Sequence, residues 1–508
     1  MFTFNLISAW RNLKKNRVVS GINILGLAIG LTCAIFAIVF AHHELTYENY
    51  HEHADRVCRV YTYGNFGSME KVPTTFGATA NELEGTFPEI QMAARSRSVS
   101  GTVFKKEQPI QENDILVAEE SIFSILSFRF LKGSQPSGPN NIILSQSMAT
   151  KYFGPEAPLG KSIEISIQGN KQTYTVEGVF EDFPTNTHVN ASFVLPFSLA
   201  YRLGWNPDQH YGTNFSVYTL LREGAHVKEL NTKIAKELDI PVELKNVKYG
   251  LVPIKRIHLY EDITQNARGN LLMLLIGGFV VLAITIFNYI NSSTILFSTR
   301  MKEIGIKKTI GGSRGFIFKQ FFIDTGLAVT IGFGFAFLLF FIFKPYFNDM
   351  MDTQIGFDFN GIVIATLAGL FLLTILISGF YPAYQSLNVK TVNLIREGSI
   401  SPVNMNRLSN ALITIQFVVA VLLLQFIIIS QKQANHMFDQ DVLKFNGDDV
   451  VCIDGYSWGN LNTVKQDLLK SPAIKNVSWG SHLPGVQVNM TSEWKQDGNQ
   501  EMANRLSC

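Results

Sequence analysis

A glycine-rich stretch that contains a lysine is the first candidate for chemistry. Residues 153–162 read FGPEAPLGKS, which approaches the phosphate-binding loop of nucleotide hydrolases, G-x-x-x-x-G-K-[ST]. Five residues rather than four separate Gly154 from Gly160. Pro155 and Pro158 also have no backbone N–H to offer a phosphate oxygen. The stretch therefore argues against nucleotide binding and indicates a loop that leads from a helix into a strand.

A cluster of histidines and carboxylates is the second candidate. Residues 42–53 read HHELTYENYHEH, and imidazole and carboxylate groups are the ligand types of zinc. The spacing is not that of H-E-x-x-H, so we interpret the segment as a solvated helical stalk and predict no metal site. We find no paired carboxylates and no activated nucleophile either. The sequence predicts no catalytic residue and no cofactor-binding residue, and we expect that the protein is not an enzyme.

The elements around these candidates are dominated by apolar segments. The chain has 508 residues, of which 46% are hydrophobic and only 17% are charged, and the apolar residues gather in five long segments. A helix needs roughly 18–20 such residues to cross a hydrocarbon core of about 30 Å. We therefore predict an α-helical multi-span membrane protein. The predicted spans are 18–41, 270–297, 320–343, 361–384 and 408–430.

The placement of charge predicts the orientation of these spans. Basic residues dominate segments 1–17, 298–319 and 385–407. Because positively charged segments stay in the cytoplasm, we predict a multi-pass protein of the inner membrane with a cytoplasmic N-terminus. The same rule places three segments outside: 42–269, the short loop 344–360 and the C-terminal stretch 431–508.

The long outer segment 42–269 mixes strand and helix patterns. The stretches KSIEISIQG and TYTVEGVF alternate apolar and polar residues, as half-buried strands do. The stretch HVKELNTKIAKEL instead repeats its apolar residues at three- and four-residue steps, as a helix does. We predict a large α+β extracytoplasmic domain.

The first seventeen residues have the pattern of an amphipathic helix. Leu6, Ile7, Trp10 and Leu13 fall on one face, and basic residues follow near the end. Such a helix lies along the membrane interface rather than crossing it. It is interpreted either as a membrane anchor or as a lever that touches a cytoplasmic partner.

Polar residues also occur within the predicted spans. Asn288, Asn291, Ser292 and Ser293 fall together near the inner end of the second span. Polar groups at this depth either line a substrate path or join helices by hydrogen bonds, and we favour helix packing. The centres of the spans carry no lysine, arginine, aspartate or glutamate, which argues against an ion relay through the membrane.

The cytoplasmic stretch 298–325 is the most informative segment of the chain. It reads STRMKEIGIKKTIGGSRGFIFKQFFIDT. Basic residues spaced along an apolar segment, followed by Gly311 and Gly312, indicate a short helix against the membrane and then a turn. Its charge fits a docking surface and fits a plain cytoplasmic loop equally well.

Several stretches resemble one family. The family is that of the FtsX-like permeases, the group that includes MacB-type exporters and lipoprotein-releasing permeases. The loop after their second span is similar to the stretch RMKEIGIKKTIGGSRGFIFKQF. The end of their fourth span is similar to GFYPAYQSLNVKTVNLIREG. Three further stretches resemble the MacB-like periplasmic core domain of the two-repeat permeases of Bacteroidetes: YENYHEHADRVCRV, KYFGPEAPLGKSIEI and YTVEGVFEDFPTNTHV. NRLSNALITIQFVVAVLLL is similar to the start of their second repeat.

This resemblance implies a permease subunit of an ABC transporter that has no cofactor of its own and works with a separate ABC ATPase, which uses the ATP. Motion driven by ATP would pass through the spans to the periplasmic domain for export or extrusion. In the family, the loop after the second span forms a coupling helix that docks on the ATPase. The matching residues are Lys302, Glu303, Ile304, Gly305, Ile306, Lys307, Lys308 and Gly311.

The resemblance also implies further partners and one alternative. A periplasmic adaptor or outer-membrane channel, membrane lipid and a dimeric or pseudo-dimeric assembly are expected, and nucleic acid is not. Relatives of this layout have four spans in each repeat, so we expect a second repeat that is truncated after its first span. The alternative function is an FtsX-like or peptide-sensing signalling scaffold that controls a cell-wall hydrolase or a sensor kinase.

Overall fold

The computed structural model divides the chain into two compact units. One contains Met1–Leu45 and Ala267–Val450, and the other contains Thr46–Asn266 and Val451–Cys508. We call them the membrane unit and the outer unit and describe each by itself. The structure describes residues 2–66, 69–105, 108–210, 212, 214–238, 247–260, 267–299, 314–351, 353–356, 360–388, 406–437, 450–451 and 461–478.

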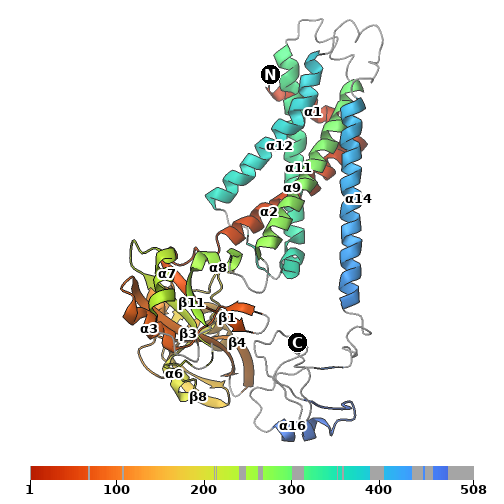
Figure 1. Cartoon of the computed structure of the whole chain (residues 1–508). Coiled ribbons are helices and arrows are strands. Elements are labelled where there is room, and N and C mark those ends of the chain that lie inside the picture. The colour runs from red at the N-terminus through yellow and green to blue at the C-terminus, as the bar shows by residue number, and fades with distance from the viewer. Residues whose placement is uncertain are drawn as a thin grey trace, which may run out of the picture. The chain divides into compact units, whose positions relative to one another are not determined.

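The membrane unit is built from long apolar helices, which confirms the multi-span prediction. Within the described residues, five helices are long and apolar enough to cross a membrane. The first of them, α2, packs against α9 and α11 (Figure 1), and 67% of its most apolar window is buried within the protein. The five are α2 (Arg17–Leu45), α9 (Ala267–Thr299), α11 (Arg314–Met351), α12 (Gly361–Asn388) and α14 (Asn406–Met437).

Glycines let α2 and α9 approach closely. A Cβ atom built on Gly30 of α2 would lie 2.1 Å from Oγ1 of Thr285 on α9. A Cβ atom on Gly278 of α9 would lie 3.0 Å from the carbonyl oxygen of Cys33 on α2. Small residues at such crossings bring helix backbones into van der Waals contact, which drives helix association where the hydrophobic effect is weak. The sequence at these two glycines therefore sets the spacing of the first two spans.

The long helices continue beyond the apolar segments that predicted them. α11 begins at Arg314 and ends at Met351, so the last part of the predicted loop 298–319 and the first part of the predicted loop 344–360 are helical. α2 likewise ends at Leu45, four residues after the predicted span 18–41. Backbone hydrogen bonds within a helix do not depend on side-chain polarity, so the helix continues where charged residues begin.

The predicted amphipathic helix at the N-terminus is confirmed as a helix, α1 (Phe2–Lys15). It packs against α11. Ala9 is buried, whereas Leu6, Ile7 and Trp10 are exposed. Two different faces of α1 are thus apolar, and one of them faces away from the described part of the protein.

The outer unit confirms the predicted α+β domain. Its sheet has eleven strands among the described residues, in the order β11-β1-β10-β3-β4-β9-β6-β8-β5, while β2 pairs with β1 and β7 pairs with β3 and β8. Most neighbours are antiparallel, but β4 with β9 and β6 with β8 are parallel. The strands are β1 (Val57–Phe66), β2 (Met69–Val72), β3 (Ile90–Lys105), β4 (Gln108–Ala118), β5 (Phe130–Gly133), β6 (Asn141–Ser145), β7 (Ser162–Ile167), β8 (Asn170–Phe180), β9 (Phe193–Pro196), β10 (Ser216–Leu221) and β11 (Lys248–Pro253).

Short helices cover this sheet and complete its core. Leu230 and Ile234 of α7 are buried with Leu83 of α3 against residues of β1, β10 and β11. Their three- and four-residue spacing is the helical pattern predicted for this stretch. The helices are α3 (Ala78–Thr86), α4 (Ile122–Ile125), α5 (Gln146–Phe153), α6 (Ser198–Arg202), α7 (Val227–Glu237), α8 (Ile254–Tyr260) and α16 (Leu461–Leu468).

Candidate functional site

The stretch FGPEAPLGKS is a connection between α5 and β7, as predicted. Gly154 and Gly160 have φ angles of 61° and 74°, a left-handed conformation that glycine adopts without steric cost. The N–H of Gly160 donates to the carbonyl of Val176 at 2.8 Å, and the N–H of Lys161 donates to the carbonyl of Pro158 at 3.1 Å. The ammonium group of Lys161 pairs with Glu156. These groups satisfy one another, so the loop is not arranged to hold a phosphate.

The residues assigned to ATPase coupling lie outside the described residues. Lys302, Glu303, Ile304, Gly305, Ile306, Lys307, Lys308 and Gly311 all fall between α9 and α11. Their role therefore remains a prediction of the resemblance.

A buried carboxylate marks the place where the chain leaves α2 and enters the outer unit. Glu48 lies in a turn three residues after α2 ends, and it is 0% exposed. Its φ angle is 65°, a conformation that residues other than glycine rarely adopt. The N–H of Glu48 donates to the carbonyl of Asn186 at 2.9 Å. A strained backbone and a buried acid persist together only where the surroundings hold both in place.

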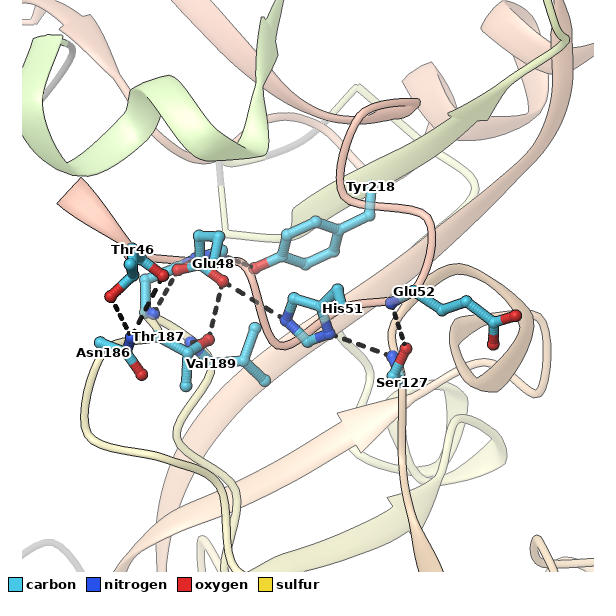
Figure 2. A network of polar contacts seen from close by, with 10 residues as sticks. Thr46, Glu48, His51, Glu52, Ser127, Asn186, Thr187, Val189 and Tyr218 are labelled. Carbon is cyan, nitrogen blue, oxygen red and sulfur yellow. Dashed lines mark hydrogen bonds and ion pairs between the residues drawn. The ribbon is translucent and has the colours of Figure 1, made fainter. Parts of the chain in front are cut away.

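Both oxygens of Glu48 face donors from the loop before β9, and one of them also faces His51 (Figure 2). Oε1 accepts from the backbone N–H of His188 and from its Nδ1, each at 2.6 Å. Oε2 accepts from the hydroxyl of Thr187 at 2.8 Å and lies 3.3 Å from Nε2 of His51. Charge-assisted bonds of this kind are the strong ones, and together they offset the cost of burying the charge.

The two histidines extend the network to other parts of the domain. Because Nδ1 of His188 donates to Glu48, its Nε2 accepts from the hydroxyl of Tyr218 on β10, at 2.8 Å. Nδ1 of His51 accepts from the backbone N–H of Ser127 at 3.1 Å, so its Nε2 carries the hydrogen that faces Glu48. The segment after α2 is thereby attached to β10 and to two separate loops.

Further contacts in the same segment strengthen this attachment. Nδ2 of Asn186 donates to the carbonyl and to the hydroxyl of Thr46, at 3.1 and 3.2 Å. The ring of Tyr47 stacks on that of His258 in α8, with 3.8 Å between ring centroids. Since α8 lies shortly before α9 in the chain, this stack joins the start of the outer unit to its end. We call the residues Thr46, Glu48, His51, Asn186, Thr187, His188 and Tyr218 the joint.

The electrostatics of the joint agree with its hydrogen bonds. Burial by itself would raise the pKa of Glu48, but the neighbouring His188 and the bonds from His188 and His51 hold that pKa well below its ordinary value of 4.5. Burial lowers the pKa of His188 below its ordinary 6.5, although the Glu48 carboxylate acts in the opposite direction. Burial raises the pKa of Tyr218. At neutral pH the joint therefore contains an ionised Glu48, a neutral His188 and a protonated phenol.

We expect acid to destabilise the outer unit through these two groups. Both Glu48 and His188 have a lower pKa in the folded protein than in the unfolded chain, so the unfolded chain binds more protons as pH falls. Stability should be fully present above the ordinary histidine pKa of 6.5 and decline below it, with a further decline below the ordinary glutamate pKa of 4.5. Urea unfolding midpoints of the detergent-solubilised chain, measured from about pH 7.5 to about pH 5, check this.

The variant His188→Asn is the control for this pH dependence. Asparagine retains an N–H donor near the position of Nδ1 but does not titrate. The midpoint of the variant should therefore change less with pH between these two values than that of the parent. An equally steep change in both proteins would assign the acid sensitivity to other groups.

The sequence interpretation was wrong for part of the histidine segment. Glu48 and His51 do not belong to a solvated helix, because α2 ends at Leu45 and both side chains are buried. The described residues contain no group of three or more histidine, cysteine or acidic side chains placed to hold a metal ion. Sequence reasoning missed His188 and Tyr218, since both lie more than a hundred residues away from Glu48. The signal available was that YENYHEH and FPTNTHV each belong to a stretch of the family resemblance.

Two family models match the chain in succession. The MacB-like periplasmic core domain matches residues 20–237, and the FtsX-like permease C-terminal domain matches residues 275–391. The first match contains every residue of the joint. The second contains the residues assigned to ATPase coupling.

Relatives of known name are similar at low identity. The macrolide export ATP-binding/permease protein MacB of Aggregatibacter actinomycetemcomitans is 20% identical over 344 residues, which cover 62% of this chain and 49% of that protein. The protein of the same name from Neisseria gonorrhoeae is 23% identical over 274 residues, which cover 50% of this chain and 38% of the relative. The chain thus spans about half the length, or less, of these relatives.

Solved structures of outer domains are also similar to part of the chain. The periplasmic region of MacB from Actinobacillus actinomycetemcomitans has a TM-score of 0.31 and 16% identity, over 42% of this chain and 94% of that one. The extracellular domain of the noncanonic ABC-type transporter YknZ from Gram-positive bacteria has a TM-score of 0.30 and 17% identity, over 39% and 99%. The family assignment depends on the sequence models: a MacB-like periplasmic core domain followed by an FtsX-like permease domain makes this chain an FtsX/MacB-like ABC permease.

Proposed function

We propose that this permease transmits motion driven by ATP from a separate ATPase to its outer domain, in the service of export or extrusion. The joint is the observation that carries this proposal. A domain that is moved by a helix must be attached rigidly where the helix enters it, and the joint attaches the segment after α2 through both oxygens of one buried carboxylate.

The proposed path through the membrane unit begins at the coupling residues. They immediately precede α11, which packs against α2. α2 continues without a break into Thr46 of the joint. We propose that ATP-driven movement of the coupling segment shifts α11 and α2 together and reaches the outer domain through the joint. This path requires the N-terminus of the chain to be cytoplasmic.

The same proposal includes the partners of this permease. An ABC ATPase would dock on the segment between α9 and α11, with Glu303 and Gly305 at the contact. A periplasmic adaptor or outer-membrane channel would receive the motion of the outer unit. The exposed apolar surface of α14, where each described side chain from Ile415 to Ile429 is at least partly exposed, would meet lipid or a second copy in a dimeric or pseudo-dimeric assembly.

The double variant Glu303→Ala with Gly305→Ala tests the ATPase contact. We expect it to lower the permease-dependent stimulation of ATPase activity by roughly fivefold or more and to weaken co-purification of the two subunits, because a coupling contact of this kind is worth about 1–3 kcal/mol. ATP hydrolysis by the co-expressed pair, reconstituted in lipid, is the measurement.

The matched control for this test is the double variant Glu397→Ala with Gly398→Ala. It changes the same residue types in the other predicted cytoplasmic segment, and we expect stimulation close to that of the parent. If the Glu303 and Gly305 variant stimulates the ATPase as well as the control does, the coupling assignment fails. If stimulation depends on these residues while deletion of the gene leaves export unchanged and impairs a cell-wall hydrolase or a sensor kinase, the signalling alternative replaces export.

A further inference from the structure

The N-terminal helix α1 has an exposed surface that is both apolar and basic. Leu6, Ile7 and Trp10 are 39%, 53% and 48% exposed. Residues 1–17 contain four basic residues and no acidic one. The four basic side chains are all exposed: Arg11, Lys14, Lys15 and Arg17. The packing of the described protein thus leaves this surface open to a ligand.

One face of α1 combines the two kinds of side chain. Three- and four-residue steps connect Ile7, Trp10, Arg11 and Lys14, and such steps place residues on the same side of a helix. The ammonium group of Lys14 lies 5.5 Å from the ring centroid of Trp10, within the range of a cation–π contact. Ala9 belongs to the other side of the helix and is buried. The exposed face therefore presents apolar and cationic groups together.

The contacts of α1 hold this face at the level of the membrane surface. Only Asn16 separates the end of α1 from the start of α2, where a candidate span begins. Nδ2 of Asn12 donates to Oδ2 of Asp324 at 3.5 Å, and Asp324 lies near the start of the candidate span Phe318–Met351. The helix is thus attached to the ends of two spans, at the depth where lipid headgroups lie.

The positive charge of this surface is not balanced by acids of the described protein. Among the described residues, no ion pair involves Arg11, Lys14, Lys15 or Arg17. The charge is therefore available to an external anion.

The apolar part of the surface continues into the membrane span. Val18 and Ile22 at the start of α2 are 75% and 59% exposed. Exposed aliphatic side chains on a spanning helix are suited to contact with acyl chains, since the hydrocarbon core is as apolar as they are. Apolar exposure thus extends from Ile7 and Trp10 on α1 to the lipid-facing part of α2.

We propose that the exposed face of α1 is a docking surface for anionic phospholipids, with Arg11 and Lys14 on the lipid phosphate and with Ile7 and Trp10 at the start of the acyl chains. Amphipathic helices that carry Lys or Arg beside Trp and Leu bind anionic membrane surfaces in this way. Basic groups next to a span attract anionic lipid, and tryptophan prefers the interface. A protein partner would account for the charge but not for the continuity with the span. The proposal holds for either orientation of the chain and does not depend on an ATPase partner.

Fluorescence quenching by brominated lipid in nanodiscs tests this surface. The full chain is reconstituted in phosphatidylcholine with increasing fractions of phosphatidylglycerol that is brominated near the headgroup end of its acyl chains. Brominated phosphatidylcholine is the reference lipid. Because the chain has five tryptophans, the signal of Trp10 is the difference between the parent and Trp10→Phe.

The anionic lipid should quench Trp10 more effectively than the reference lipid. We expect half-maximal quenching at a mole fraction at least roughly fivefold lower, since each basic residue near the surface adds to the attraction. Added salt should reduce this preference, because the charges are exposed and are screened.

Arg11→Gln with Lys14→Gln is the decisive double variant. Glutamine is a good helix former, and both side chains are exposed, so α1 should fold as in the parent. We expect the preference for the anionic lipid to fall to near that of the reference. Arg11→Lys with Lys14→Arg keeps both charges and should retain it. The matched control is Lys228→Gln with Lys236→Gln, which removes two exposed charges from α7 of the outer unit and should quench as the parent does.

Thermal stability separates a lipid site from a site for free phosphate. Phosphatidylglycerol added to the full chain in detergent should raise the melting temperature relative to phosphatidylcholine, as a ligand of the folded state does. Sodium phosphate should match sodium chloride of the same ionic strength. A rise with phosphate alone would indicate a site for small anions and would overturn the proposal.

Two quenching results would also overturn the proposal. The first is equal quenching of Trp10 by the two brominated lipids, and loss of ATPase co-purification in the α1 double variant would then assign the surface to a protein partner. The second is an anionic preference that is the same in the α1 double variant and in the α7 control, because Arg11 and Lys14 would then not bind the lipid.

Discussion

Replacing Glu48 by glutamine is expected to lower the free energy of unfolding of the outer unit by about 3–5 kcal/mol, the usual cost of breaking a buried charged network by removing one member. The amide has nearly the shape of the carboxylate but offers only one acceptor oxygen. Its NH₂ group would face donors, either those of His188 or those of Thr187 and His51. The strained φ angle of 65° at Glu48 would then lose the bonds that stabilise it. Urea unfolding of the detergent-solubilised chain, followed by intrinsic fluorescence, measures the change.

Glu52→Gln is the matched control for this prediction. Glu52 is exposed and its side chain points away from the joint, although its backbone N–H donates to Ser127 (Figure 2). Substitutions of exposed residues outside such networks usually change stability by less than about 0.5 kcal/mol. If Glu48→Gln proves as mild as Glu52→Gln, the joint does not hold the outer unit in place, and the observation behind the proposed transmission path is lost.

Replacing Gly30 by alanine is expected to destabilise the packing of α2 on α9 by about 1–3 kcal/mol, the usual cost of overpacking. The added Cβ atom would lie 2.1 Å from Oγ1 and 2.9 Å from Cβ of Thr285. The Thr285 side chain cannot easily rotate, because its hydroxyl donates to the carbonyl of Leu282 at 2.8 Å. The helices must move apart, which opens the packing around α2, whose most apolar window is 67% buried within the protein. A lower melting temperature and a smaller monodisperse fraction in detergent would report this.

Gly21→Ala on the same helix separates packing from helix propensity. Nothing lies within 4 Å of a Cβ atom placed on Gly21, and alanine favours a helix by about 1 kcal/mol relative to glycine. This variant should be neutral or more stable than the parent. Adding Thr285→Ala to Gly30→Ala removes two of the three clashing atoms and should recover part of the loss. No recovery, or an equal loss in Gly21→Ala, would contradict the assigned contact.

Helices and strands that depend on the pattern of neighbouring residues were predictable from the sequence. A membrane span depends on the mean hydropathy of about twenty consecutive residues, and all five predicted spans lie within helices of the structure. Strands β7 and β8 and helix α7 follow from the periods of their own side chains. The ends of the long helices were less accurate, because α11 extends into both predicted loops.

The contacts of the outer unit were not predictable, because they join residues far apart in the chain. Arg95 shows this well. It is 4% exposed and pairs with Glu119 at 2.6 Å and with Asp208 at 2.7 Å. In the sequence it is one basic residue among many, and only the folded sheet gives it two partners. The joint is a second example, since no pattern connects HHELTYENYHEH with Thr187, His188 and Tyr218.

The sequence by itself determined that the chain crosses a membrane several times, that an α+β domain is inserted after the first span, and that FGPEAPLGKS departs from the phosphate-loop pattern. These conclusions depend on local hydropathy, on side-chain periodicity and on the missing N–H groups of two prolines. Only the tertiary structure decided that Glu44 and Glu48 of the histidine segment are buried while Glu52 is exposed, and which donors surround Glu48. The free energy of a buried charge depends on the donors that surround it, and for Glu48 those donors come from a loop about 140 residues away.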